Sequence, residues 1–228
     1  MPAWLRCCGG LNWTTPLCCD SSAMTQWRND AGSNWLFTKR VLSFATQDLD
    51  EPEAALRQAV ASTSGSHVWG IWHGLFGLAA NQLLMVTAHA QDHDGWLPAA
   101  GCKVESEWIL RSTVRPESPA PLEKPGIYVF RDFWLPSQHV QQAVQLSTEA
   151  WQTFEGADSY AAQPMGLFAP VDQSSEGECV LHLLTWYPDF AAWETSRESD
   201  PTAKKRFMAR RALTRTTSAV ATRLRLPS

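Results

Sequence analysis

The same order of predicted elements occurs twice along this chain, on either side of a proline-rich segment, and few folds accommodate such an order. In the first half, alternating apolar residues predict four strands, and the spacing at 50–61 predicts an amphipathic helix. The strands are expected at 35–43, 67–76, 83–89 and 105–114. A second helix at 91–100 would be short, because Gly95 and Pro98 weaken it.

The second half repeats this plan after residues 116–125, a stretch with four prolines that predicts a stiff linker. Helices are expected at 138–154 and 200–213, and Asp200 and Pro201 suit the start of the second one. Strands are expected at 126–135, 160–171, 179–187 and 217–226, with a short helical turn at 189–194.

Short sequence echoes support a duplication. The echoing runs are Gly-Leu-Phe at 74–76 and 166–168, and Gln-Ala-Val at 58–60 and 142–144. Lys39 and Arg131 occupy matching places in the two first strands. The β-α-β-β-α-β order is the ferredoxin-like plan. We therefore predict an α+β fold of two tandem ferredoxin-like repeats that pack sheet to sheet within one chain.

The predicted organisation has four parts. They are a poorly structured leader at 1–33, a first repeat at 34–116, the linker at 117–125 and a second repeat at 126–228. The leader is rich in Gly, Thr, Ser and Cys and shows neither strand nor helix periodicity. We expect it to be dispensable, with Met24 as an alternative start, so that removing it leaves the melting temperature nearly unchanged.

Composition narrows the classes of function. Hydrophobic residues make up 44% and charged residues 18%, and the formal net charge is -4, which predicts a folded domain without a nucleic-acid surface. No apolar run approaches the roughly 20 residues of a membrane span, and no secretory signal is evident, so a cytoplasmic location is expected. Four of the six cysteines form the adjacent pairs 7–8 and 18–19, a spacing that does not match zinc sites. We therefore expect no metal.

Three segments of the second half carry a family resemblance. They are Tyr-Val-Phe-Arg-Asp-Phe at 128–133, Val-Leu-His-Leu-Leu-Thr-Trp-Tyr at 180–187 with the turn that follows, and the terminal helix and strand. On these segments, residues 126–227 resemble the NIPSNAP family. This resemblance implies the dimeric α/β-barrel superfamily, in which two ferredoxin-like units enclose a barrel. That superfamily includes cofactor-free monooxygenases, isomerases, haem-handling enzymes and proteins without known activity, so it does not give the function by itself.

Alternation along the strands suggests which residues line the barrel lumen. We expect the faces with cationic or imidazole side chains to point inward, since a helix-covered face would have to desolvate them. The candidate site residues are His182, Arg131 and His73 for catalysis, and Trp186, Trp69, Lys39, His89 and Phe133 for ligand binding. A histidine suits proton transfer near neutral pH, and an arginine or lysine suits a carboxylate or enolate oxygen.

Two classes of function fit these residues. In the first, the chain is a NIPSNAP-like protein that binds a small apolar or aromatic molecule in the lumen or acts as an adaptor. In the second, it is an enzyme of the barrel superfamily, either a cofactor-free monooxygenase or an isomerase. A haem-dependent form with one of the histidines as axial ligand is the weaker variant of the second class. A homodimer is compatible with both.

We expect the second repeat to hold the principal ligand site. Arg131, His182 and Trp186 would converge on the lumen face of one sheet, where a cation, an imidazole and an indole suit a flat aromatic anion. In the first repeat, Met85 takes the place of His182 by hairpin alignment. The competing expectation is that Glu105 or Glu107 neutralises Arg131 across the barrel, which would leave no charge for a ligand.

Overall fold

The structure is a computed structural model that describes residues 35–90, 101–155, 161–172, 177–197 and 201–227. The predicted leader, the alternative start at Met24 and the short helix expected at 91–100 lie outside these residues. Among the described helices, none is long and apolar enough to cross a membrane.

The first half forms the expected strands and helix. Its elements are β1 (Trp35–Ser43), α2 (Asp50–Ala61), β2 (Ser66–Phe76), β3 (Gln82–Ala90) and β4 (Lys103–Ser112). Helix α2 carries three acidic residues in its first turn, where their negative charge interacts favourably with the helix dipole. It buries Leu56 and Val60 against the sheet.

The second half also follows the prediction closely. Its elements are β5 (Ile127–Pro136), a 3₁₀ turn (Ser137–His139), α3 (Val140–Glu155), β6 (Gln163–Pro170), β7 (Glu178–Tyr187), α4 (Phe190–Thr195), α5 (Pro201–Leu213) and β8 (Thr216–Leu224). The expected helical turn at 189–194 is α4, whose N-cap Asp189 accepts a hydrogen bond of 2.8 Å from the Ala192 amide.

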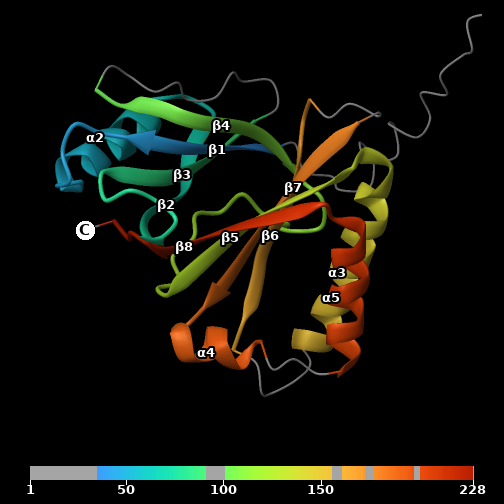
Figure 1. Ribbon diagram of the computed structural model, residues 1–228. Coiled ribbons are helices and arrows are strands. Elements are labelled where there is room, and N and C mark those ends of the chain that lie inside the picture. The colour runs from blue at the N-terminus through green and yellow to red at the C-terminus, as the bar shows by residue number, and fades with distance from the viewer. Residues whose placement is uncertain (1–34, 91–100, 156–160, 173–176, 198–200, 228) are drawn as a thin grey trace, which may run out of the picture.

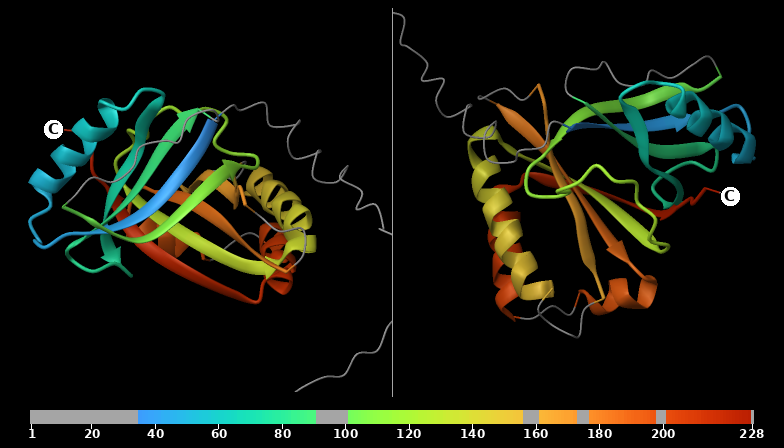
Figure 2. Two further views of the ribbon diagram at one scale, coloured as in Figure 1. Left: turned by 90° about the horizontal axis from the view of Figure 1, so that it is seen from above. Right: turned by 180° about the vertical axis from the view of Figure 1, so that it is seen from behind.

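The eight strands close into one antiparallel barrel in the order β1-β3-β2-β8-β5-β7-β6-β4. Each half contributes four neighbouring strands in the order fourth, first, third, second, which is the ferredoxin-like arrangement. The halves join where β2 pairs with β8 and where β4 pairs with β6. Figures 1 and 2 show the two sheets facing each other, with α2 outside the first sheet and α3 and α5 side by side outside the second.

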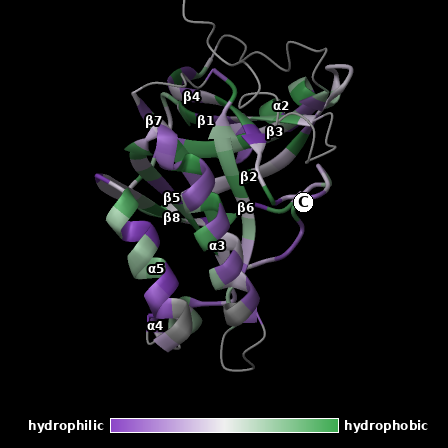
Figure 3. Cartoon of the chain, turned by 90° about the vertical axis from the view of Figure 1, so that its right-hand side faces the viewer, coloured by the Kyte–Doolittle hydropathy of each residue, from purple (hydrophilic) through white to green (hydrophobic). Residues whose placement is uncertain are grey.

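The hydrophobic core is divided by the sheets into an inner and an outer part. The lumen is filled by side chains from both halves, including Phe37, Trp69, Trp72, Tyr128 and Phe168. Outside the sheets, one cluster packs under α2 and another under α3. Figure 3, which faces α3 and α5, shows hydrophilic and hydrophobic residues mixed along α5.

The proline-rich linker packs onto the barrel as well as joining its halves. The Leu122 amide donates to the Trp69 carbonyl at 2.8 Å, and the Trp186 indole donates to the Pro125 carbonyl at 3.0 Å. Lys124 lies 3.3 Å from the centre of the Trp186 ring. These contacts hold the linker against the lumen residues Trp69 and Trp186.

The second strand of each half, β2 or β6, contains a bulge, and these two bulges show which residues of the halves correspond. The register shifts between Val68 and Gly70 in β2 and between Pro164 and Gly166 in β6. A Cβ atom on Gly70 would lie 2.3 Å from the Trp72 ring, and one on Gly166 would lie 2.4 Å from the Phe168 ring. Each glycine therefore makes room for the aromatic ring two residues later. The predicted echo of Gly166 by Gly74 is thus wrong, and Gly70 is the structural counterpart.

Candidate functional site

The strand registers place the eight predicted site residues on opposite sides of the sheets. Lys39, Trp69, His182 and Trp186 face the lumen as expected. Arg131, Phe133, His73 and His89 lie on the outer, helix-side faces. The expected convergence of Arg131, His182 and Trp186 on one lumen face is therefore wrong.

Each misplaced residue has a local reason. His182 pairs across strands with Asp132, so Arg131 points to the opposite face. The β2 bulge reverses the alternation after Trp69, which turns Ile71 and His73 outward.

His73 lines a small outer cavity of about 340 Å³ with Asp48, Asp50 and Arg225. Burial, and then Arg225 and Arg223, lower its pKa. His89 is buried and its Nε2 atom lies 3.0 Å from the Thr38 hydroxyl. Neither histidine reaches the lumen.

Three polar side chains meet inside the lumen. Lys39 Nζ donates to the two carboxylate oxygens of Asp132 at 2.8 and 3.1 Å, and His182 Nδ1 lies 2.7 Å from Asp132 Oδ1. The His182 ring packs against Trp108, with ring centres 5.1 Å apart. Because Lys39 comes from the first half and the other two from the second, this lumen trio ties the halves together.

The charges of the trio follow from its burial and its hydrogen bonds. Burial alone would raise the pKa of Asp132, but the hydrogen bond with His182 and the charge of Lys39 outweigh it and lower that pKa to about 2. Burial lowers the pKa of His182, against the opposing effect of Asp132. A neutral His182 beside an ionised carboxylate favours the tautomer with a proton on Nδ1. Its Nε2 atom is buried without a hydrogen-bond partner in the described structure.

Sequence reasoning overlooked Asp132. Adjacent side chains in a strand point to opposite faces of the sheet. One of Arg131 and Asp132 must therefore face the lumen. That signal was available in the sequence, and it places Asp132 beside His182 once the register is known.

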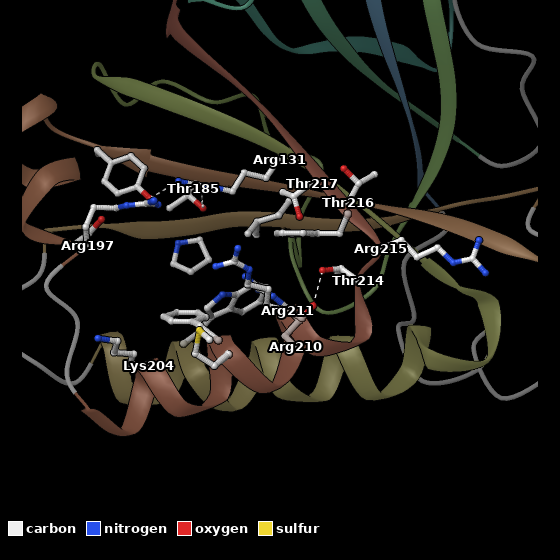
Figure 4. Close-up of a pocket in the computed structure, with 18 residues that line it drawn as sticks. Arg131, Thr185, Arg197, Lys204, Arg210, Arg211, Thr214, Arg215, Thr216 and Thr217 are labelled. Atoms are coloured by element: carbon white, nitrogen blue, oxygen red, sulfur yellow. Dashed lines mark hydrogen bonds between the residues drawn. The ribbon is translucent and has the colours of Figure 1, made fainter.

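A cavity larger than that at His73 lies outside the barrel, between the second sheet and α5, and is called the outer cavity below. It has a volume of about 860 Å³, within the range of small-molecule sites. Its floor is formed by residues of β5, β7 and β8, and its opposite wall by α5 (Figure 4). The basic residues that line it are Arg131, Arg197, Lys204, Arg210, Arg211 and Arg215. No carboxylate is among the described lining residues.

Arg131 lies on the sheet side of this outer cavity. Its guanidinium donates to the hydroxyl oxygens of Thr185 at 3.4 Å and Tyr187 at 3.2 Å. Glu105 and Glu107 are engaged elsewhere, with Lys103 and Arg40, so the expected neutralisation by either of them is wrong. In the described part of the chain, Arg131 makes no ion pair.

Arg210 faces Arg131 from α5. Its guanidinium donates to the Ser147 hydroxyl at 3.0 Å and lies 4.5 Å from the centre of the Phe133 ring. Burial, and then the like charge of Arg131, lower the pKa of Arg210 to about 10. Like Arg131, it pairs with none of the described carboxylates. Two neighbouring guanidiniums that no described carboxylate neutralises make this part of the cavity suited to an anion.

The first repeat shows what is different about Arg131. The strand pairing identifies the counterpart of Arg131 in the first half. Across the first sheet, Gly70 is level with Lys39, and across the second sheet Gly166 is level with Phe130. Lys39 therefore corresponds to Phe130, and the next residue, Arg40, corresponds to Arg131. Arg40 contacts a threonine hydroxyl as Arg131 does: its Nη1 atom lies 3.5 Å from the Thr87 hydroxyl oxygen. The earlier matching of Lys39 with Arg131 is thus off by one residue.

The two arginines differ in the strand that flanks them. Arg40 lies opposite Glu107 of β4, and its Nε atom is 2.5 Å from the Glu107 carboxylate. Arg131 lies opposite Ala219 of β8 at the equivalent place. The second repeat therefore keeps the arginine and lacks its carboxylate, on the side where the cavity lies.

The outer cavity does not contain the histidines that the sequence suggested as haem ligands. His182, His73 and His89 are not among its lining residues, so none of the proposed axial ligands is available there. Within the described residues, no three His, Cys, Asp or Glu side chains gather in a way that could hold a metal ion. The haem-dependent form proposed with these histidines does not fit this cavity.

The comparisons with known proteins give the fold. No family model matches the sequence, and no curated protein matches it. A solved anthrone oxidase-like protein aligns with a TM-score of 0.60 at 10% identity, over 86% of this chain and 93% of that chain. A chlorite dismutase variant from Candidatus Nitrospira defluvii aligns with a TM-score of 0.54 at 11% identity, over 90% of this chain and 96% of that chain.

A putative monooxygenase from Lactobacillus acidophilus NCFM aligns with a TM-score of 0.50 at 9% identity, over 83% of this chain and 93% of that chain. The fold is that of the dimeric α/β barrels. Here, one chain supplies both ferredoxin-like halves of the barrel.

Proposed function

We propose that this chain is a small-molecule enzyme of the dimeric α/β-barrel type, and that it binds an aromatic anion in the outer cavity of its second half. The observation that carries the proposal is the pair Arg131 and Arg210, which face one cavity without a carboxylate partner in the described structure. Phe133 and Leu183 give the cavity an apolar wall beside these charges. An apolar wall with a few convergent polar groups suits a flat anion.

The cationic wall suggests what the site does chemically. Two guanidiniums stabilise a negative oxygen, so they lower the pKa of a bound phenol or enol and favour its anion. No described carboxylate or imidazole lines the cavity, so the proton would leave through the cavity mouth to solvent. An electron-rich enolate or phenolate is the form that reacts with dioxygen. The names of two similar structures, anthrone oxidase-like and putative monooxygenase, support oxygenation as the reaction class.

The NIPSNAP-like adaptor is the second candidate. The close packing of aromatic side chains in the lumen favours it, because a filled lumen leaves surface contacts as the means of action. The outer cavity favours the enzyme, because its Arg131 and Arg210 pair with no described carboxylate. The similar structures also support the enzyme more than the adaptor.

Ala219→Glu tests the binding site by copying the first repeat. A glutamate opposite Arg131 should pair with it as Glu107 pairs with Arg40, and so compete with an anionic ligand. We expect naphthoate affinity to fall about ten-fold or more, as the loss of a charge-assisted hydrogen bond implies. Affinity is measured by displacement of a fluorescent anilinonaphthalene sulfonate.

Ala219→Gln is the matched control, since it has the same length without the charge, and it should bind naphthoate as the parent does. His182→Gln should also keep the affinity, because His182 lies on the lumen face. Equal affinity of the Glu and Gln variants would contradict the proposed site.

Oxygen consumption separates the enzyme from the adaptor. We expect the parent protein to take up dioxygen with a phenolic or enolisable aromatic substrate, and Ala219→Glu to reduce the rate. Naphthoate binding without oxygen uptake across a panel of such substrates would favour a binding protein over an oxygenase.

A further inference from the structure

Two buried hydroxyl groups of β7 share Arg131 and line the outer cavity. Thr185 and Tyr187 are two residues apart in one strand, so both side chains lie on its outer face. Only 7% of Thr185 and 4% of Tyr187 is exposed. Both hydroxyl oxygens accept a hydrogen bond from Arg131, and Figure 4 shows Arg131 and Thr185 together on the sheet side of the cavity. One guanidinium therefore holds both hydroxyls in place.

The protons of these two hydroxyls are directed away from Arg131. A hydroxyl oxygen that accepts a hydrogen bond can still donate its own proton to a second group. Within the described residues, neither Thr185 nor Tyr187 donates to another protein group. Buried polar groups are generally hydrogen-bonded, and the cavity is the space that both side chains line. Both protons therefore suit an acceptor that enters the cavity.

The first half satisfies the corresponding groups internally. By the strand pairing, His89 corresponds to Tyr187 and Thr38 to Val129. His89 Nε2 lies 3.0 Å from the Thr38 hydroxyl, and its Nδ1 atom lies 3.2 Å from the Ala90 carbonyl oxygen. A valine side chain has no polar atom, so the second half lacks the equivalent partner. The half that holds the cavity has thus lost an internal partner here, as it has at Ala219.

The ring of Tyr187 is fixed by the core beside the cavity. It packs in one cluster with Ile127 and Val129 of β5, and Trp193 of α4 packs against that cluster. A hydroxyl on a fixed ring loses little conformational freedom when it binds a ligand. Its position is therefore set before a ligand arrives.

We infer that the hydroxyls of Tyr187 and Thr185 donate hydrogen bonds to the anionic oxygens of the ligand, and that Arg131 holds both hydroxyls from behind. This inference rests on the proposed function and names the groups that select its ligand. Two adjacent donors suit a ligand with two acceptor oxygens on one edge, either a carboxylate or a phenolate beside a carbonyl group.

Tyr187→Phe tests the stronger donor, because it keeps the ring and removes only the hydroxyl. We expect naphthoate affinity, measured by displacement of anilinonaphthalene sulfonate, to fall about ten-fold. Tyr128→Phe is the matched control, since its hydroxyl donates to the Lys124 carbonyl and its side chain lies in the lumen. It should bind naphthoate as the parent does. Parental affinity in Tyr187→Phe would overturn the inference.

Thr185 supplies a second and independent pair of variants. Thr185→Val removes the hydroxyl, and we expect naphthoate affinity to fall about three-fold or more. Thr185→Ser keeps the hydroxyl and should retain the parental affinity. Equal affinity of the Val and Ser variants would show that Thr185 is not a donor to the ligand.

A nitrophenolate probe separates hydrogen bonding from a change in the shape of the cavity. A hydrogen bond to the phenolate oxygen stabilises the ground state more than the charge-transfer excited state, so it moves the absorption band to shorter wavelength. We expect saturating para-nitrophenolate to absorb at shorter wavelength on the parent than on Tyr187→Phe. A tyrosine that only supports the cavity would change the affinity and leave the band in place, which contradicts the inference.

Failure of the proposed function gives a different pattern. In that case, Ala219→Glu leaves the affinity for naphthoate unaltered. If only the present inference fails, Ala219→Glu still weakens binding, whereas Tyr187→Phe binds naphthoate as the parent does.

Discussion

At the scale of single residues, the lumen trio shows how burial decides charge. His182 is buried, its pKa is lowered from 6.5 by that burial, and its only described polar neighbours are Asp132 and Lys39. In the unfolded chain the imidazole takes up a proton near its ordinary pKa, whereas in the folded protein it stays neutral to lower pH. The unfolded state therefore binds more protons as the pH falls below 6.5, and stability is lost in that direction.

His182→Gln should reduce this pH dependence. Between about pH 7 and about pH 5, the parent should lose more free energy of unfolding than the variant, by up to about 1.4 kcal/mol per pH unit. Asp132 contributes little in this window, because its ordinary pKa of 3.8 and its lowered pKa of about 2 in the folded protein both lie below it. Denaturant unfolding at several pH values measures the difference, and parallel pH profiles for the two proteins would show that His182 is not the group responsible.

At the scale of elements, the bulged strands β2 and β6 each place an aromatic ring in the lumen two residues after the bulge glycine. Gly70→Ala would bring a Cβ atom to 2.3 Å from the buried Trp72 ring, and Gly166→Ala to 2.4 Å from the Phe168 ring. Because both rings are enclosed, the strain cannot be relieved cheaply. We expect each substitution to lower the free energy of unfolding by about 1 to 3 kcal/mol, measured by denaturant titration.

A second prediction at this scale concerns the outer faces of β1 and β4, where Arg40 and Glu107 lie opposite each other. The Arg40 guanidinium is buried and forms an ion pair with Glu107, whose side chain is 40% exposed. Glu107→Gln should therefore destabilise the protein by about 1 kcal/mol, measured by chemical unfolding. Ala219→Glu should raise the stability of the unliganded protein, since it gives Arg131 the partner that Arg40 already has. A destabilised Ala219→Glu protein would show that Arg131 is already compensated.

At the scale of the whole molecule, the two halves depend on each other for their cores. The lumen cluster draws side chains from all eight strands of the barrel and therefore from both halves. Either half alone would expose this apolar surface. Residues 126–228 expressed alone should be insoluble, or should pair with a second copy, rather than form a stable monomer. Sedimentation of that fragment measures this, and a soluble, folded monomer would contradict it.

The pseudo-symmetry of the barrel gives a sharper test of the lumen trio. By the strand pairing, Lys39 corresponds to Phe130, Asp132 to Val41, and His182 to Leu84. The symmetry-related place in the lumen therefore holds three apolar side chains. Lys39→Met alone should cost about 2 to 3 kcal/mol, because it leaves Asp132 without its cation. Replacing the trio with Phe, Val and Leu should restore most of that stability in thermal or chemical unfolding. If the triple variant is no more stable than Lys39→Met, the trio contributes more than its charges.

The sequence by itself determined the elements and their repeated order, because strand alternation and helical spacing are local properties of neighbouring residues. Strand β1 and helix α2 have the predicted bounds. From the same alternation, Arg131 and His182 each have a definite face, but which face is the lumen depends on pairing with distant strands. Only the tertiary structure brought Asp132 beside His182, Arg210 opposite Arg131, and Ala219 to the place that Glu107 occupies in the first repeat. These contacts join residues far apart in the chain, so strand alternation gives the relative faces of neighbouring residues but not which distant residues meet.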